Sequence, residues 1–97
     1  MTLRPDAYAA YKLAHDRLWP EVAESMRIHE VSMAIFRDGN RLYLFAAAPS
    51  QAHWERSRRV PVLADWDSTM TQYLETDRQG RIAFDSLPKA FGFGEFA

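Results

Sequence analysis

The stretch "MAIFRDGNRLYLFAA", residues 33–47, places two apolar runs on either side of a short polar segment. An Asp-Gly pair between two such runs is a strong hairpin signal, because glycine adopts the positive φ angles of tight turns without a steric penalty. We therefore predict a strand over residues 31–37, a turn at 38–40 and a second strand over 41–47.

Helical periodicity flanks the hairpin on both sides. A first helix is predicted over residues 5–29, with Pro20 either kinking it near His15 or starting a new segment. Two further helices are predicted over 51–58 and 61–75, followed by a short strand over 81–84. One stripe of the first helix is largely apolar and faces inward; it contains Tyr8, Tyr11, His15, Leu18, Trp19, Val22 and Met26.

This order of elements predicts one domain over residues 1–97 with an α+β fold. Helices on one face of an antiparallel sheet would give the ferredoxin-like plan. That plan opens with a strand, whereas only residues 1–4 precede the first predicted helix. The first strand is therefore expected to be truncated, which leaves open a late start codon, a strand swapped from another subunit or a modified sheet.

Composition narrows the class of protein. The chain has 97 residues, 47% of them apolar, a net charge of −1 and no cysteine. This charge argues against nucleic acid or an anionic membrane surface as a partner, and the lack of cysteine excludes disulfides and thiol nucleophiles. No apolar run could span a bilayer, so we expect a cytoplasmic protein. Small domains often gain stability by pairing, which favours a homodimer.

His15 is the first candidate for chemistry, because a neutral imidazole can donate or accept a proton near physiological pH. Tyr11 lies one helical turn earlier, so the phenol and the imidazole could converge on one ligand. The alternative is a partly buried histidine in the core, paired with a nearby oxygen. The residues alone leave both interpretations open.

The predicted helix over residues 61–75 carries the second set of candidates. Asp67 lies on the flank of its inward stripe, where it could contact a sugar hydroxyl, share proton transfer with His15 or simply be solvated. Trp66 and Trp19 offer flat faces for sugar C–H groups, although tryptophans on an inward stripe are usually core. Trp54 is expected in the core, and the basic run at 55–59 on a solvated helix face. No histidine pair or carboxylate cluster indicates a metal site.

Three segments together resemble the L-rhamnose mutarotase family: "RPDAYAAYKLAHDRLWPEV" at 4–22, the hairpin at 33–47 and "DWDSTM" at 65–70. The resemblance implies a small dimeric α/β barrel of ferredoxin-like fold. It also implies an enzyme that interconverts the α and β anomers of L-rhamnose without a metal or organic cofactor.

The resemblance also assigns roles to individual positions. His15 corresponds to the family's catalytic acid, Tyr11 to a tyrosine that contacts the sugar, and Trp66 to the first of two neighbouring tryptophans at the substrate. Asp67 stands where the second tryptophan is expected, and Met33 stands where a substrate-contacting tyrosine is expected. Half of the sugar-contacting shell thus differs, which bears on the identity of the sugar more than on the proton chemistry.

We therefore expect a sugar mutarotase acting on L-rhamnose or a related monosaccharide, with His15 as general acid and base. An alternative is a domain of the same fold that binds a sugar without catalysis. A cofactor-free oxygenase is a third hypothesis, because a fold of this kind does not fix its function.

Overall fold

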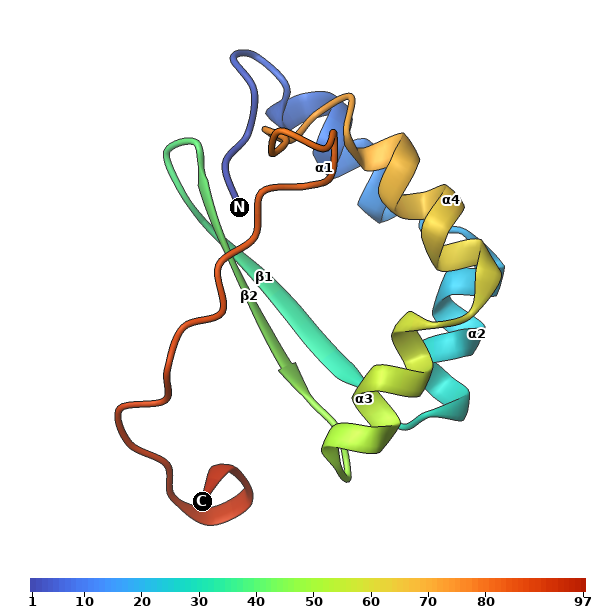
Figure 1. The fold of residues 1–97 in the computed structure, drawn as a ribbon, viewed down its shortest axis with the longest axis vertical. Helices are drawn as coiled ribbons and strands as arrows, with labels where there is room; N and C mark the ends of the chain where they lie inside the picture. Colours follow the sequence, from blue (N-terminus) through green and yellow to red (C-terminus); the bar gives the residue numbers. More distant parts are fainter.

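The predicted hairpin forms the sheet of the protein, which is described over all 97 residues by a computed structural model (Figure 1). Strands β1 (Ser32–Asp38) and β2 (Arg41–Ala47) pair antiparallel, with Asp38 opposite Arg41. Gly39 opens the two-residue loop between them at a φ of +61°, a conformation that is costly for residues with a side chain. The hairpin and its turn are thus confirmed.

Four helices lie on one side of this hairpin, as Figure 1 shows. They are α1 (Tyr8–Asp16), α2 (Pro20–Ile28), α3 (Gln51–Arg58) and α4 (Pro61–Met70). Helix α2 packs against both α3 and α4. This arrangement confirms the predicted α+β class, with an antiparallel sheet covered by helices on one face.

The long first helix of the sequence prediction is divided into α1 and α2. Of the two outcomes expected at Pro20, the structure shows the second: Pro20 is the first residue of α2, where its missing N–H needs no partner. The prediction was wrong about the start, since α1 begins at Tyr8 rather than at residue 5. Asp6 has a φ of +59°, which is incompatible with a right-handed helix there.

The first strand of the ferredoxin-like plan is present as a very short segment at the centre of the sheet. Thr2 bridges to Arg41 at the start of β2, and Leu3 bridges to Leu74 on the other side. The Leu3 N–H donates to the carbonyl of Asn40 at 2.7 Å. The central strand therefore consists of isolated bridges only.

The segment after α4 differs from the prediction because it pairs with this central segment. Helix α4 ends at Met70, five residues before the predicted end at residue 75. Leu74 becomes extended, and the Glu75 N–H donates to the carbonyl of Thr2 at 2.8 Å. The strand predicted over 81–84 is reduced to a single bridge between Thr76 and Ile82. Tertiary pairing here overrides the local helical pattern.

The core lies between the helices and the inner face of the hairpin. Its buried apolar residues are Leu3, Tyr11, Val22, Leu42, Leu63, Trp66, Met70 and Leu74. Trp54 was expected among them, and that prediction was wrong, because its side chain is only half-buried. None of the four helices has the length and apolar character needed to cross a membrane.

Candidate active site

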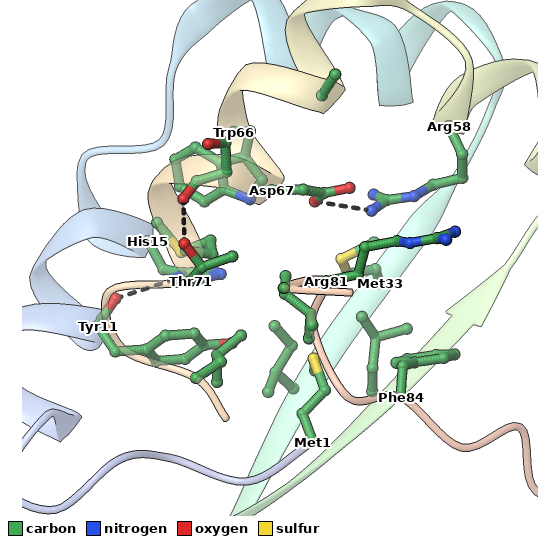
Figure 2. A pocket seen from close by; sticks show the side chains of 18 of the residues that line it. Met1, Tyr11, His15, Met33, Arg58, Trp66, Asp67, Thr71, Arg81 and Phe84 are labelled. Carbon is green, nitrogen blue, oxygen red and sulfur yellow. Dashed lines mark hydrogen bonds and ion pairs between the residues drawn. The ribbon is translucent and has the colours of Figure 1, made fainter. Parts of the chain in front are cut away.

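A cavity of about 670 Å³ opens between helices α1, α3 and α4 and the inner face of the hairpin. Figure 2 shows the side chains that surround it. Five of the six predicted site residues line it: Tyr11, His15, Met33, Trp66 and Asp67. Residues from three separate parts of the sequence are thus brought to one hollow.

Helix α1 places Tyr11 and His15 on the same side, one turn apart, with ring centroids separated by 4.2 Å. The Nδ1 atom of His15 lies 3.0 Å from the main-chain carbonyl oxygen of Tyr11. A carbonyl oxygen can only accept, so Nδ1 carries the proton in the neutral ring and Nε2 is left as the basic nitrogen. The helix therefore fixes the tautomer of His15.

The phenol of Tyr11 reaches the cavity from a largely buried ring. Only 5% of the residue is exposed, and burial raises its pKa to about 12. The Tyr11 hydroxyl makes no hydrogen bond to another protein group. Every fully buried side-chain polar atom in the structure does have such a partner, so this hydroxyl is not fully buried. At neutral pH it is protonated and can donate or accept a hydrogen bond with a ligand in the cavity.

Trp66 is the residue of helix α4 that contacts His15 of helix α1. Its ring lies edge-on to His15, with centroids 5.2 Å apart and planes at 77°. Trp19 packs against Trp66 in the same manner, at 5.2 Å and 83°. Such edge-to-face pairs are favourable and fix the relative orientation of the rings.

The structure does not confirm Trp19 as a cavity residue. It is absent from the cavity lining and supports Trp66 from the side. The prediction continued the period of α1 through residue 19. Trp19 instead occupies the N-cap position of α2, after the helix has broken, so its side chain no longer follows the direction set by Tyr11 and His15.

Asp67 projects from α4 into the same cavity and meets Arg58 from the end of α3. Nη2 of Arg58 donates to Oδ1 of Asp67 at 3.3 Å (Figure 2). Burial raises the pKa of the Asp67 carboxyl above its usual range, and the positive charge of Arg58 opposes that rise. Asp67 is thus a partly desolvated carboxylate that one guanidinium holds in place.

Sequence reasoning missed the contribution of α3 to this site. Arg58 was placed on a solvated face, although it lies four residues after Trp54, and residues with this spacing share one side of a helix. Both line the cavity, and the Arg58 guanidinium lies 5.5 Å from the centroid of the Trp54 ring. The spacing between the two residues was therefore the signal that could have identified Arg58.

The segment after α4 supplies other lining residues that no sequence pattern indicated, among them Thr71, Arg81 and Phe84. They reach the cavity because this segment folds back beside the short central strand. No three histidine, cysteine or acidic side chains in the chain are grouped to hold a metal ion. The arrangement offers acid–base groups, an aromatic wall and two guanidinium groups.

The chain matches the sequence model of the L-rhamnose mutarotase family over residues 1–91. It belongs to the L-rhamnose mutarotase family. The family resemblance seen in the sequence is thereby confirmed.

Individual members of the L-rhamnose mutarotase family have low sequence identity to this chain but match it over most of its length. L-rhamnose mutarotase from Klebsiella pneumoniae is 30% identical over 94 residues, which cover 94% of this chain and 90% of that protein. The Enterococcus faecalis protein is 28% identical over 94 residues, covering 94% and 91%. The crystal structure of L-rhamnose mutarotase from Formosa agariphila is 24% identical, with a TM-score of 0.79 over 97% of this chain and 93% of that one. The fold is thus shared along nearly the whole chain.

Proposed function

We propose that the protein is an aldose mutarotase that interconverts the α and β anomers of L-rhamnose or a related monosaccharide. The single observation that carries the proposal is the position of His15, whose Nδ1 is held by the Tyr11 carbonyl while the ring lines the cavity. The names of the relatives support a sugar as substrate.

The reaction requires two proton transfers of opposite direction. The ring oxygen gains a proton, the anomeric hydroxyl loses one, and the bond between C1 and the ring oxygen breaks to give an open-chain aldehyde. Rotation about the C1–C2 bond presents the other face of the carbonyl, and ring closure reverses both transfers. No atom is gained or lost, so the cycle needs one group that donates a proton to the ring oxygen and later recovers it, and a second group that takes the anomeric proton and later returns it. Such a group typically contributes about 10²- to 10⁴-fold.

His15 is the group that exchanges the proton in this proposal. In its protonated form Nε2 donates to the ring oxygen, and after ring opening the neutral ring can take the proton back. The hydrogen bond from Nδ1–H to the Tyr11 carbonyl is retained in both forms. The imidazole therefore changes charge without having to rotate.

The neighbouring residues position the sugar around His15. The Tyr11 hydroxyl orients a sugar oxygen, and the Trp66 ring supplies an apolar surface for C–H groups. Asp67 accepts the proton of the anomeric hydroxyl during ring opening and returns it during ring closure, and Met33 contacts the sugar from strand β1. Trp19 acts indirectly, by holding Trp66.

Magnetisation exchange between the two anomeric protons of L-rhamnose tests the proposal directly. The protein should accelerate the exchange well above the rate in buffer, and related aldoses should be tested in parallel. Buffer rates for every sugar with folded protein would contradict the enzymatic function. In that case, a sugar-dependent change in tryptophan fluorescence without exchange would identify a binding domain instead.

We also propose that two copies associate, as the resemblance to a dimeric α/β barrel implies, and that they meet through the outer face of the hairpin. Phe36, Tyr43 and Phe45 are exposed by 62%, 43% and 49%, although the alternation of the strands places them together on the face away from the helices. Sedimentation equilibrium should give twice the mass of the chain. The Phe36→Lys variant should be monomeric, and a monomeric wild-type protein would contradict the proposal.

A further inference from the structure

Two arginines give the cavity a positive end that the proposed reaction does not itself require. Arg58 comes from the end of α3, and Arg81 comes from the segment that follows α4. Figure 2 shows Tyr11 and His15 at one side of the cavity, with the Arg58 and Arg81 side chains extending toward the other. Asp67 is the only carboxylate among the side chains that line it. Two positive side chains and one negative leave one positive charge uncompensated.

The guanidinium groups have most of their donors uncommitted to the protein. Arg58 makes a single contact with Asp67, from Nη2 to Oδ1 at 3.3 Å, rather than the paired contact that a guanidinium and a carboxylate can form. The Arg81 side chain makes no hydrogen bond or ion pair; its main-chain N–H donates to the Asp77 carboxylate instead. Each guanidinium has five N–H donors in a planar fork.

The surroundings of these two arginines differ from those of neighbouring cations. Arg59, the next residue after Arg58, pairs with Glu55 at 3.8 Å and lies outside the cavity.

The opposite side of the cavity is aromatic, and its floor is formed by apolar residues of the hairpin, including Ile35 and Leu44. A ligand that fits must therefore offer a ring for the aromatic side and a negatively charged, planar group for the arginines.

We propose that the sugar bound here carries a carboxylate, as in a uronic acid, and that Arg58 and Arg81 are the residues that select it. This inference rests on the proposed function, because it assumes that the ring of the same sugar lies against His15. The arginines hold the carboxylate at the positive end, with Asp67 orienting the Arg58 guanidinium. A 6-deoxy sugar has a methyl group in place of this carboxylate and leaves the two cations without a partner.

Anomer exchange with matched sugars tests the inference. D-galacturonate and D-galactose differ in the carboxylate, as do D-glucuronate and D-glucose, and L-rhamnose is added as the 6-deoxy sugar. The kcat/KM for at least one uronate should exceed that for its neutral counterpart and for L-rhamnose by about tenfold or more, since a charge-assisted bond is worth about 1.5–3 kcal/mol. Equal or higher kcat/KM values for the neutral sugars would overturn the inference.

Three arginine variants make the test specific. Arg58→Met and Arg81→Met should each lower the ratio of uronate to neutral kcat/KM by about tenfold, mainly through KM. Arg59→Met is the matched control on the same helix end and should leave the ratio unchanged. Arg81 lies in an exposed segment, so its variant remains informative if Arg58→Met fails to fold. An unchanged ratio in the Arg81→Met protein would overturn its assigned role.

A binding measurement separates this inference from the proposed function. Titration with D-galacturonate and with D-galactose, followed by tryptophan fluorescence, reports on the cavity through Trp54 and Trp66. The uronate should bind more tightly than the neutral sugar, and added salt should weaken its binding. No exchange with any sugar would overturn the mutarotase function alone. Uronate binding no tighter than that of the neutral sugar would overturn the inference alone.

Discussion

His15 donates its Nδ1 proton to the main-chain carbonyl of Tyr11 over 3.0 Å, one turn earlier on the same helix. A carbonyl at this position is normally bonded to the N–H four residues later, so the imidazole shares an acceptor that the helix already provides. The contact fixes the ring plane and leaves Nε2 as the unprotonated nitrogen of the neutral ring. A helix with an ordinary sequence period thus sets both the orientation and the tautomer of His15.

Replacement of Tyr11 by phenylalanine separates its polar role from its packing. The ring stays buried while the accessible hydroxyl is lost, so kcat/KM for anomer exchange should fall about tenfold, the value of one hydrogen bond of about 1–1.5 kcal/mol. Circular dichroism should show an unchanged fold. Full activity in Tyr11→Phe would mean that the hydroxyl does not contact the sugar.

Tyr11 also predicts a dependence of stability on alkaline pH. Burial raises its pKa from 10.0 to about 12, so the folded state holds this proton more tightly than the unfolded state does. The associated stability is complete below pH 10 and is lost as the pH rises through 12, at up to about 1.4 kcal/mol per pH unit. Urea unfolding between these values should show a steeper decline for the wild-type protein than for Tyr11→Phe. Equal slopes would contradict the raised pKa.

Trp66 and Trp19 are two tryptophans in contact with each other, and only Trp66 lines the cavity. Trp66→Phe should lower kcat/KM for anomer exchange, because the sugar surface shrinks and His15 loses its edge-to-face partner. Trp19→Phe should reduce the free energy of unfolding by about 1–2 kcal/mol with a smaller loss of activity. Initial rates together with urea unfolding measure both effects. A larger loss of activity in Trp19→Phe would reverse the roles assigned to the two rings.

The Arg58–Asp67 pair predicts a change in acid–base behaviour. Burial raises the pKa of the Asp67 carboxyl and Arg58 opposes the rise, so Arg58→Met should raise this pKa further. The folded state then holds the proton more tightly, and the free energy of unfolding should decline more as the pH rises through this pKa than it does in the wild-type protein. The carbon-13 shift of the Asp67 carboxyl, followed against pH, measures the pKa. A lower pKa in the variant would exclude an electrostatic contact.

The short central segment predicts a localised effect on stability. Leu3 is only 1% exposed and its main chain bridges both neighbours, so Leu3→Ala should cost about 2–5 kcal/mol of unfolding free energy. Leu13 on α1 is 49% exposed, and Leu13→Ala should cost less than about 0.5 kcal/mol. Equilibrium urea unfolding compares the two. Similar costs for both variants would mean that the central segment does not contribute to the core.

The parts of the fold that were predictable are those specified by local sequence. The Asp38-Gly39 turn fixes the hairpin, and α3 follows its predicted bounds because Ser50 caps its first turn by accepting from the His53 N–H. The end of α4 was not predictable in this way. Residues 71–75 have a helical pattern, yet they leave the helix because Leu74 pairs with Leu3, more than 70 positions away in the sequence.

The same distinction applies to the candidate site. Tyr11 and His15 share one unbroken helix, so their convergence followed from spacing alone. Trp19 lies beyond the break at Pro20, where helical periodicity gives the wrong direction. Arg81 reaches the cavity from a segment without regular structure, and only the tertiary path of that segment brings it there.

The exchange rate between the anomeric protons of a bound sugar, compared between wild-type protein and His15→Ala, is the most direct measurement of the central claim. The wild-type protein should accelerate the exchange, and the variant should lose about 10²- to 10⁴-fold of that acceleration while remaining folded. His53→Ala is the matched control, because His53 lies on α3 outside the cavity and should retain the full rate. If His15→Ala accelerated the exchange as much as the wild-type protein does, His15 would not be the group that exchanges the proton.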